Sequence, residues 1–508
     1  MSRFKFTVLA GCLALSVAAS PLALAQGGTL TVAPVAPGDP GSFDPIDTFL
    51  VAWGSIGSQI YDGLTMRGAD MKLVPGLATS WEMLDNNQRI RFKLRENVKF
   101  HDGEPFNAQA VKFTFDRLLG DEGKKGPQRS NYDSIKEIKI VDEHTVDFLL
   151  ARPDPVLLIK LAGYGSMIVP PKYVTEKGDA YFNAHPVGTG PFKFVSYQPK
   201  VSLTLERNPD YWGGAPKLEK LVYRFITEPS TQASELLAGR LDIAANIPLS
   251  MASVIERDSH LNVVAIDGPT TAALRYDTRD GITKDPEVRK ALTLAVDRNA
   301  IIKQIMLGYA VPAASFQGKL SFGYDENLKP LPFDPAQAKK ILKKQGVKPG
   351  TPVQIDFRGS DANFREVAQA VAGYFQAVGL KPTLKGYETS VLLNDIIPNG
   401  KTGNMWQNLW GGWTFDYDNT AYAMYHSGQK WNPYDKDAKL DAMLEEQRNT
   451  YDQDKRLKIL REVAAYVQDH ALEMPLYNIK AVFGVNKRVK NLTIPSDGRF
   501  RFVNATVD

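Results

Sequence analysis

Residues 74–117 read VPGLATSWEMLDNNQRIRFKLRENVKFHDGEPFNAQAVKFTFDR, and this stretch determines more of the fold than any other. Apolar and basic residues alternate through residues 90–95, which is the two-residue period of a half-buried strand. The run His-Asp-Gly-Glu-Pro at residues 101–105 is typical of a turn. Asn107 then occupies an N-cap position, and Val111, Phe115 and Leu118 follow at helical spacing. The stretch therefore predicts a strand, a tight loop and a helix.

The same alternation of strand and helix continues along the chain. Residues 353–357 have the composition of a strand, and apolar residues recur at helical spacing from Phe364 to Val378, where Gly379 closes the helix. A second strand is expected near Leu384. Asp285 and Pro286 predict the start of another helix, and a helix pair is expected over residues 440–469. Such alternation predicts an α/β fold, with helices covering mostly buried sheets.

The first 25 residues have the pattern of an export signal. Arg3 and Lys5 precede an apolar segment, and Ala23-Leu24-Ala25 is a small-residue cleavage site, so we expect the mature chain to begin at Gln26. Leu9-Ala10-Gly11-Cys12 resembles a lipoprotein box, but too little apolar sequence precedes it. We therefore expect release into the periplasm without a lipid anchor at Cys12.

The composition excludes several classes of protein. Cys12 is the only cysteine and leaves with the signal, so the mature chain has no disulfide and no thiolate chemistry. The net charge of +4 falls to +2 once Arg3 and Lys5 are removed, because residues 1–25 contain no acid. This balance gives no reason to expect nucleic acid as a partner. The remaining length is ample for two or more cores, and no later apolar run is long enough to span a bilayer.

Five motifs along the chain resemble one known family. The segment at residues 74–117 is similar to the signature of the bacterial extracellular solute-binding proteins, family 5, which are receptors of ABC importers for peptides, dipeptides and nickel. Ala110 stands where that family often has an acidic residue. The other four motifs follow in the family's order: Gly188-Thr189-Gly190-Pro191-Phe192, Asn208-Pro209-Asp210-Tyr211-Trp212, residues 285–291 and Pro475-Leu476-Tyr477.

The resemblance implies a two-lobed periplasmic-binding-protein fold of the large type, with mixed sheets flanked by helices. It implies four parts: a signal peptide (1–25), a lobe I base region (26–57, 190–267 and 485–508), a lobe I inserted region (58–189) and lobe II (268–484). The chain would cross between lobes near Gly190, Asp267 and Val485, and we expect the lobes to close around a ligand.

No enzyme motif is visible. The chain has no phosphate-binding loop, no His-Glu-x-x-His pair and no Gly-x-Ser-x-Gly elbow. None of the six histidines is spaced from another at i+3 or i+4, so no helical metal face is expected, and His426 is expected to be structural. A pair of catalytic carboxylates remains open, because 57 acidic residues give many chance pairs. We expect no catalytic residue, metal or cofactor.

The richest candidate for a ligand site is residues 410–418, Trp-Gly-Gly-Trp-Thr-Phe-Asp-Tyr-Asp. Glycines allow close backbone approach, and Trp410, Trp413 and Tyr417 offer flat apolar walls. In peptide-binding members of the family, an Asp three residues after a Trp binds the ligand's α-ammonium group, and Trp413 and Asp416 match that spacing. The proline that usually follows is absent here. The alternatives are a core cluster for the tryptophans and a solvated loop acid for Asp416.

Two further residues are candidates. Arg358 follows the strand at 353–357, and it resembles the arginine that binds the ligand's α-carboxylate in dipeptide-binding members; the alternative is an ordinary surface arginine. Trp53 could face the cleft from the first lobe. With Asp416 in the cleft, we expect Asp416→Asn to weaken ligand binding without affecting folding.

These observations favour a periplasmic receptor that binds a short peptide or an amino-acid derivative and delivers it to the transmembrane permease of an ABC importer. We expect a monomer. The ligand could instead be an oligosaccharide, an opine, glutathione or a metal chelate, since the tryptophans also suit ring stacking. An exported hydrolase or a periplasmic chaperone fits the sequence less well.

Overall fold

The computed structural model describes residues 27–35, 38–48 and 51–508. The expected signal peptide, Cys12 and Gln26 lie outside the described residues. The largest sheet has eleven strands and runs through the whole molecule. In spatial order its strands are β15 (Lys381–Tyr387), β14 (Pro352–Arg358), β16 (Met405–Gly411), β12 (Leu261–Tyr276), β17 (Glu473–Asn486), β11 (Ile243–Ala244), β1 (Thr29–Ala33), β10 (Lys220–Arg224), β9 (Ser202–Arg207) and β8 (Phe192–Gln198), and β13 (Ala310–Pro312) also pairs with β17.

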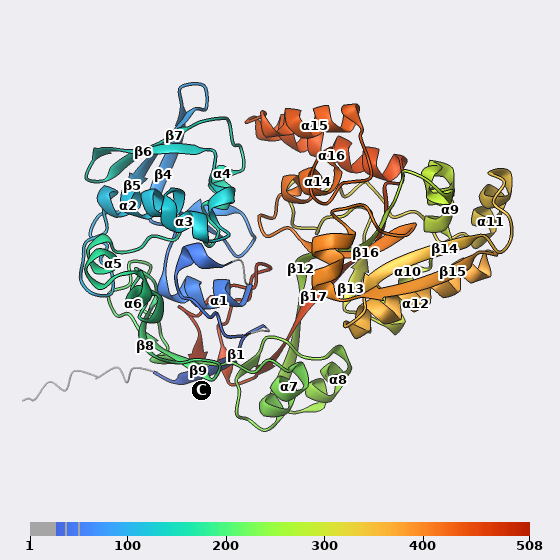
Figure 1. Ribbon diagram of the computed structural model, residues 1–508. Helices are drawn as coiled ribbons and strands as arrows, with labels where there is room; N and C mark the ends of the chain where they lie inside the picture. Colours follow the sequence, from blue (N-terminus) through green and yellow to red (C-terminus); the bar gives the residue numbers. More distant parts are fainter. Residues whose placement is uncertain (1–26, 36–37, 49–50) are drawn as a thin grey trace, which may run out of the picture.

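Two long antiparallel strands, β12 and β17, connect the two lobes (Figure 1). Their register shifts between Asp267 and Thr271. Buried apolar residues form separate cores on either side of this shift. On β17, Ile479 packs against the lobe II core, whereas Ala481 already packs against the lobe I core. Because the two cores share no side chain here, the crossing strands are the natural place for a bend.

The base region of lobe I packs helices against the β8 edge of the large sheet and against strands β11, β12 and β17. Its helices and remaining strands are α1 (Val51–Ile60), α7 (Pro229–Leu237), α8 (Leu249–Arg257), β18 (Val489–Lys490) and β19 (Thr506–Val507).

The inserted region of lobe I has its own four-stranded sheet, in the order β4-β5-β7-β6. The strand and helix predicted within residues 74–117 are confirmed as β5 and α2, and the Asn107 side chain caps α2 by accepting from Gln109 N and Ala110 N. The elements are β2 (Thr65–Arg67), β3 (Leu73–Pro75), β4 (Ala78–Leu84), β5 (Arg89–Leu94), α2 (Ala108–Leu119), α3 (Asp121–Lys125), β6 (Ile135–Asp142), β7 (Thr145–Leu150), α4 (Leu157–Lys160), α5 (Pro171–Lys177) and α6 (Asp179–Ala184).

Lobe II packs helices on the β15–β12 end of the large sheet (Figure 1). The predicted strand, helix and second strand near Leu384 are confirmed as β14, α12 and β15, and Gly379 follows α12 with a φ of 94°. Asp285 caps α9 as expected. The helices of lobe II are α9 (Pro286–Leu294), α10 (Arg298–Gln304), α11 (Pro335–Lys344), α12 (Ala362–Ala377), α13 (Thr389–Val391), α14 (Tyr417–Tyr425), α15 (Ala438–Arg448) and α16 (Gln453–Asp469). Four short 3₁₀ or π turns complete the described elements, two in lobe I (Pro45–Asp47, Arg129–Asn131) and two in lobe II (Ile282–Lys284, Leu392–Ile396).

The predicted α/β class with two lobes is confirmed by this architecture and by the structural relatives described below. The region boundaries given above remain predictions. Among the residues that the structure describes, no helix combines the length and the apolar character needed to cross a bilayer.

Candidate ligand-binding site

A cavity of about 680 Å³ lies between the lobes, beside the crossing strands β12 and β17, and we call it the hinge-side cavity. The crossing strands contribute Pro269, Thr270 and residues 479–483. Lobe I contributes Tyr164, Asn246 and Arg499, and lobe II contributes Asn363, Trp413 and Phe415. Its size is within the usual range for small-molecule sites, and both lobes line it.

The segment from Gly411 to Phe415 forms the lobe II wall of this cavity. β16 ends at Gly411, which pairs with Thr270 of β12, and the chain then turns so that Phe415 N donates to Gly412 O at 2.8 Å. Phe415 has a φ of 52°, an uncommon conformation for a residue with a side chain. The half-buried Trp413 ring reaches lobe I, where a Cβ on Gly163 would lie 2.6 Å from it.

The structure buries Asp416 beneath the same segment. Asp416 is 1% exposed, and it is the N-cap of α14. Arg456 of α16 forms a two-pronged ion pair with it, at 2.6 and 2.7 Å. The alternative of a solvated loop acid is therefore wrong, because a buried carboxylate needs a cation and Arg456 supplies one.

The ion pair is part of a larger buried network. Gln447 accepts from Arg456 and donates to Asp418, and Arg448 binds Asp418 at 2.7 and 3.0 Å. Burial opposes ionisation of Asp418, but the charges of Arg448 and Arg456 hold its pKa below the ordinary value. This network fixes the start of α14 and thereby the Trp413–Phe415 loop.

Three of the predicted ligand contacts lie in cores. Trp53 and Tyr417 have no exposed surface, and Trp410 packs edge-to-face against Trp431 at 5.9 Å. Trp53 belongs to the lobe I core, and Tyr417 and Trp410 belong to a lobe II core. A ligand could reach Trp53 and Tyr417 only after these cores opened, whereas Trp410 is partly exposed at the edge of its core. Of the four clustered tryptophans, Trp413 alone is among the residues that line the described cavities.

Arg358 lies at the end of β14, as expected, but it is not among the residues that line the hinge-side cavity. Its guanidinium lies over the Phe364 ring at 5.0 Å, and its buried Nε has no hydrogen-bond partner among the described residues. Burial lowers its pKa. Asn363, five residues further on, lines the hinge-side cavity instead. The structure thus brings Trp413 and Asn363 to one cavity, whose lining does not include Arg358.

On the lobe I side Arg499 lines the cavity, and Arg501 and Arg67 lie near Arg499 without lining it. Arg499 lies over the Tyr164 ring at 4.8 Å and donates to Ala162 O at 2.7 Å. Asp497 lies 3.3 Å from Arg499 and 3.8 Å from Arg501. Burial and the like charge of Arg499 lower the pKa of nearby Arg67 to about 10. No periodicity or motif marked these residues, because they come from distant segments of the chain.

His426 has the structural surroundings expected of it. Its ring stacks on Tyr422 at 4.3 Å, and its nitrogens contact Ser427 O and the Glu445 carboxylate. Within the described part of the chain, no group of three or more His, Cys, Asp or Glu side chains is arranged to hold a metal ion.

Comparison with known proteins identifies the family of the chain. The family model described as "Bacterial extracellular solute-binding proteins, family 5 Middle" matches residues 72–432. The chain belongs to this family. Family 5 proteins are solute-binding receptors, so the cavity between the lobes is the expected place for a solute.

Relatives within family 5 cover nearly the whole chain. The di/tripeptide-binding protein 1 of Pseudomonas aeruginosa is 29% identical over 92% of this chain and 93% of its own length. The glutathione-binding protein GsiB of Salmonella typhi is 25% identical over 91% of this chain and 92% of its own length. The structure of HbpA2 from Haemophilus parasuis superposes with a TM-score of 0.86 at 24% identity, covering 95% of this chain and all of that one.

Proposed function

We propose that this protein is the solute-binding receptor of an ABC importer and that it captures a short peptide or amino-acid derivative in the hinge-side cavity. One observation carries the proposal: residues of both lobes and of both crossing strands line a single cavity of about 680 Å³. A ligand in that position bridges the lobes and therefore stabilises the closed arrangement over the open one.

The edge of β16 suits a peptide ligand. β16 pairs with β12 from Met405 to Gly411, whereas β14 pairs with only its first two residues among the described strands. The end of the strand at Gly411 borders the cavity. An extended peptide could add its backbone along this edge, and the Trp413 ring would cover one of its side chains.

The charged contacts of the ligand stay predictions. The Asp416 carboxylate already accepts from Arg456 and from Asp418 N, so a ligand ammonium group would share it with Arg456. Arg358 would have to reorient past Phe364 to meet a carboxylate. The names of two relatives favour peptides, since one binds di- and tripeptides and the other binds glutathione, itself a modified tripeptide. An opine, an oligosaccharide or a metal chelate is the less favoured ligand.

The location, the oligomeric state and the permease partner of the receptor are also part of the proposal. A receptor of this family would be exported by the signal at residues 1–25, work as a monomer in the periplasm and dock on the transmembrane permease of its importer. It would release its ligand chemically unchanged, as a receptor and not an enzyme.

Calorimetric titration of the mature protein with di- and tripeptides tests the proposal. We expect saturable one-to-one binding and a smaller radius of gyration by solution scattering with saturating peptide. Trp413→Ala should weaken binding roughly tenfold or more, because it removes an aromatic wall. Trp81→Ala, in the sheet of the inserted region, is the matched control and should bind as wild type.

Two results would count against the proposal. One is the absence of binding by any peptide of the panel, and the other is recovery of a chemically altered peptide after many turnovers. N-acetylated peptides test the ammonium contact separately: they should bind tenfold to a hundredfold more weakly if Asp416 binds the free amine.

A further inference from the structure

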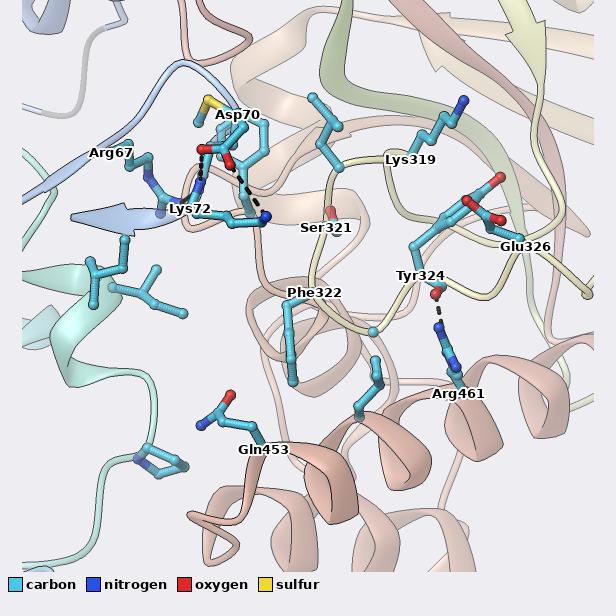
Figure 2. A pocket seen from close by; sticks show the side chains of 18 of the residues that line it. Arg67, Asp70, Lys72, Lys319, Ser321, Phe322, Tyr324, Glu326, Gln453 and Arg461 are labelled. Atoms are coloured by element: carbon cyan, nitrogen blue, oxygen red, sulfur yellow. Dashed lines mark hydrogen bonds and ion pairs between the residues drawn. The ribbon is translucent and has the colours of Figure 1, made fainter.

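A second cavity, of about 760 Å³, lies between the inserted region of lobe I and lobe II, and we call it the outer cavity. Phe415 lines both the outer and the hinge-side cavity, so its ring stands between them. Figure 2 shows Arg67 and Lys72 of lobe I on one side of the outer cavity, and Lys319 and Arg461 of lobe II across from them. The two cavities are thus neighbours along one interface between the lobes.

Arg67 is the buried polar group of the outer cavity. It is the last residue of β2, it is 5% exposed, and its guanidinium lies over the Phe415 ring at 5.2 Å. Nη2 donates to Thr414 O across the lobe interface, and Nη1 makes a long bond of 3.4 Å to Met71 O. Its Nε is buried and has no partner among the described residues. Arg67 therefore binds only carbonyl oxygens and keeps donors free.

The acids near Arg67 are already bound to other arginines. Asp416 pairs with Arg456, and Asp497 is flanked by Arg499 and Arg501. Among the described residues Arg67 thus has no direct ion pair, and the nearby Asp497 and Asp416 attract it only from a distance, so a directly bound anion would stabilise it.

The lining of the outer cavity as a whole carries a net positive charge. Its lining contains four basic side chains and two acidic ones, Asp70 and Glu326. Asp70 is already bound to Lys72 at 3.4 Å. Arg461 donates to Tyr324 O at 3.2 Å, so it faces a carbonyl and not a carboxylate. The surplus of positive charge is therefore complementary to an acidic group.

We propose that the outer cavity is a subsite for a carboxylate of the bound solute, and that Arg67 is the residue that binds it. The inference rests on the proposed function, because it takes the solute to lie in the hinge-side cavity and to extend past Phe415. A guanidinium suits this role because its planar donors match a carboxylate. The receptor then prefers acidic peptides over neutral ones of the same shape.

The alternative role for Arg67 is a latch between the lobes. Its bond to Thr414 O and its contact with Phe415 would then favour closure around any ligand. The two roles differ in one measurable respect. A latch affects all ligands by the same factor, whereas a subsite affects only those that carry the carboxylate.

Titration of matched tripeptides separates these roles. The probes are Ala-Glu-Ala, Ala-Gln-Ala and the C-terminal amide of each. We expect wild type to bind Ala-Glu-Ala roughly tenfold more tightly than Ala-Gln-Ala, as a charge-assisted hydrogen bond implies. Arg67→Gln should abolish this preference. If the two free peptides bind alike and amidation weakens both, the bound group is the terminal carboxylate.

Control variants keep the test decisive. Arg95→Gln is the matched control. Arg95 also donates to a backbone carbonyl (Gly76 O, 2.7 Å) and lies over an aromatic ring (Trp212, 4.2 Å), but it lines neither cavity. The Arg95→Gln variant should keep the preference for Ala-Glu-Ala over Ala-Gln-Ala. Arg67→Lys retains the charge and should keep part of it, which guards against a folding defect. Equal weakening of all peptides and amides by Arg67→Gln overturns the subsite, and so does a wild type that distinguishes neither Glu from Gln nor the free acid from its amide. Binding of no peptide at all overturns the proposed function itself.

Discussion

At the scale of single residues, Asp416 matches a ligand-binding motif in sequence, but its neighbours in the fold give its carboxylate a structural role. The spacing of Trp413 and Asp416 placed both in the cleft, and the structure puts Trp413 there. Asp416 instead lies under the loop, with its carboxylate and the Arg456 guanidinium both fully buried. A buried pair of this kind stabilises little when intact, but the loss of one partner leaves an uncompensated charge.

Asp416→Asn is therefore expected to destabilise the fold by about 3–5 kcal/mol, which corrects the expectation that folding would be unaffected. Urea denaturation of the purified variant measures the loss. Asp452→Asn is the matched control, because Asp452 caps α16 from an exposed position and asparagine caps about as well as aspartate. An Asp416→Asn variant as stable as this control would show that Arg456 does not depend on the pair.

At the scale of elements, the crossing strands join the lobes and also bury charge within lobe II. Arg275 of β12 and Glu473 of β17 are register partners at the lobe II end of the pair. Arg275 binds Asp435 at 3.0 Å. Burial raises the pKa of Glu473 to about 7, and the nearby charge of Arg275 opposes this shift only in part.

The raised pKa of Glu473 predicts a pH dependence of stability. Between about pH 4.5 and 7 the unfolded chain loses the Glu473 proton while the folded chain keeps it, so stability falls as the pH rises. Glu473→Gln keeps the shape and removes this titration. Its free energy of unfolding should therefore gain about 2–3 kcal/mol relative to wild type between pH 5 and 8. Denaturation at several pH values measures this, and exposed Glu366→Gln should follow wild type.

Other elements show why local structure was predictable. The alternation in residues 90–95 gave β5, and Asn107, Asp285 and Gly379 marked helix ends that the structure confirms. These features depend on residues within one or two turns of each other, so the sequence contains them in full.

At the scale of the whole molecule, side-chain contacts also join the lobes away from the crossing strands. Tyr451, between α15 and α16, is one of them. Its hydroxyl accepts from Asp154 N at 2.6 Å and donates to Asn87 O at 3.3 Å, and both partners belong to the inserted region of lobe I. These bonds exist only while the lobes are close together.

Tyr451→Phe should shift the protein toward the open arrangement. Each of the two lost hydrogen bonds is worth about 0.5–1.5 kcal/mol, so all ligands, acidic or neutral, should bind roughly fivefold to a hundredfold more weakly. Solution scattering of the ligand-free variant should give a larger radius of gyration than wild type. Tyr466→Phe removes a hydroxyl that binds Asp437 within lobe II, and it should change neither quantity. Unchanged affinity in Tyr451→Phe would mean that closure does not use this contact.

The sequence by itself determined the α/β class, the principal elements with their caps and the family, and it indicated residues 410–418 as a candidate ligand segment, of which Gly411, Trp413 and Phe415 line the hinge-side cavity. Only the tertiary structure decided which side chains of that segment face the cavity. It brought Arg456 to Asp416 across 40 residues and Arg67 to Thr414 across 347. The physical reason is range: periodicity and capping act between neighbours in sequence, whereas the partner of a buried charge depends on the path of the entire chain.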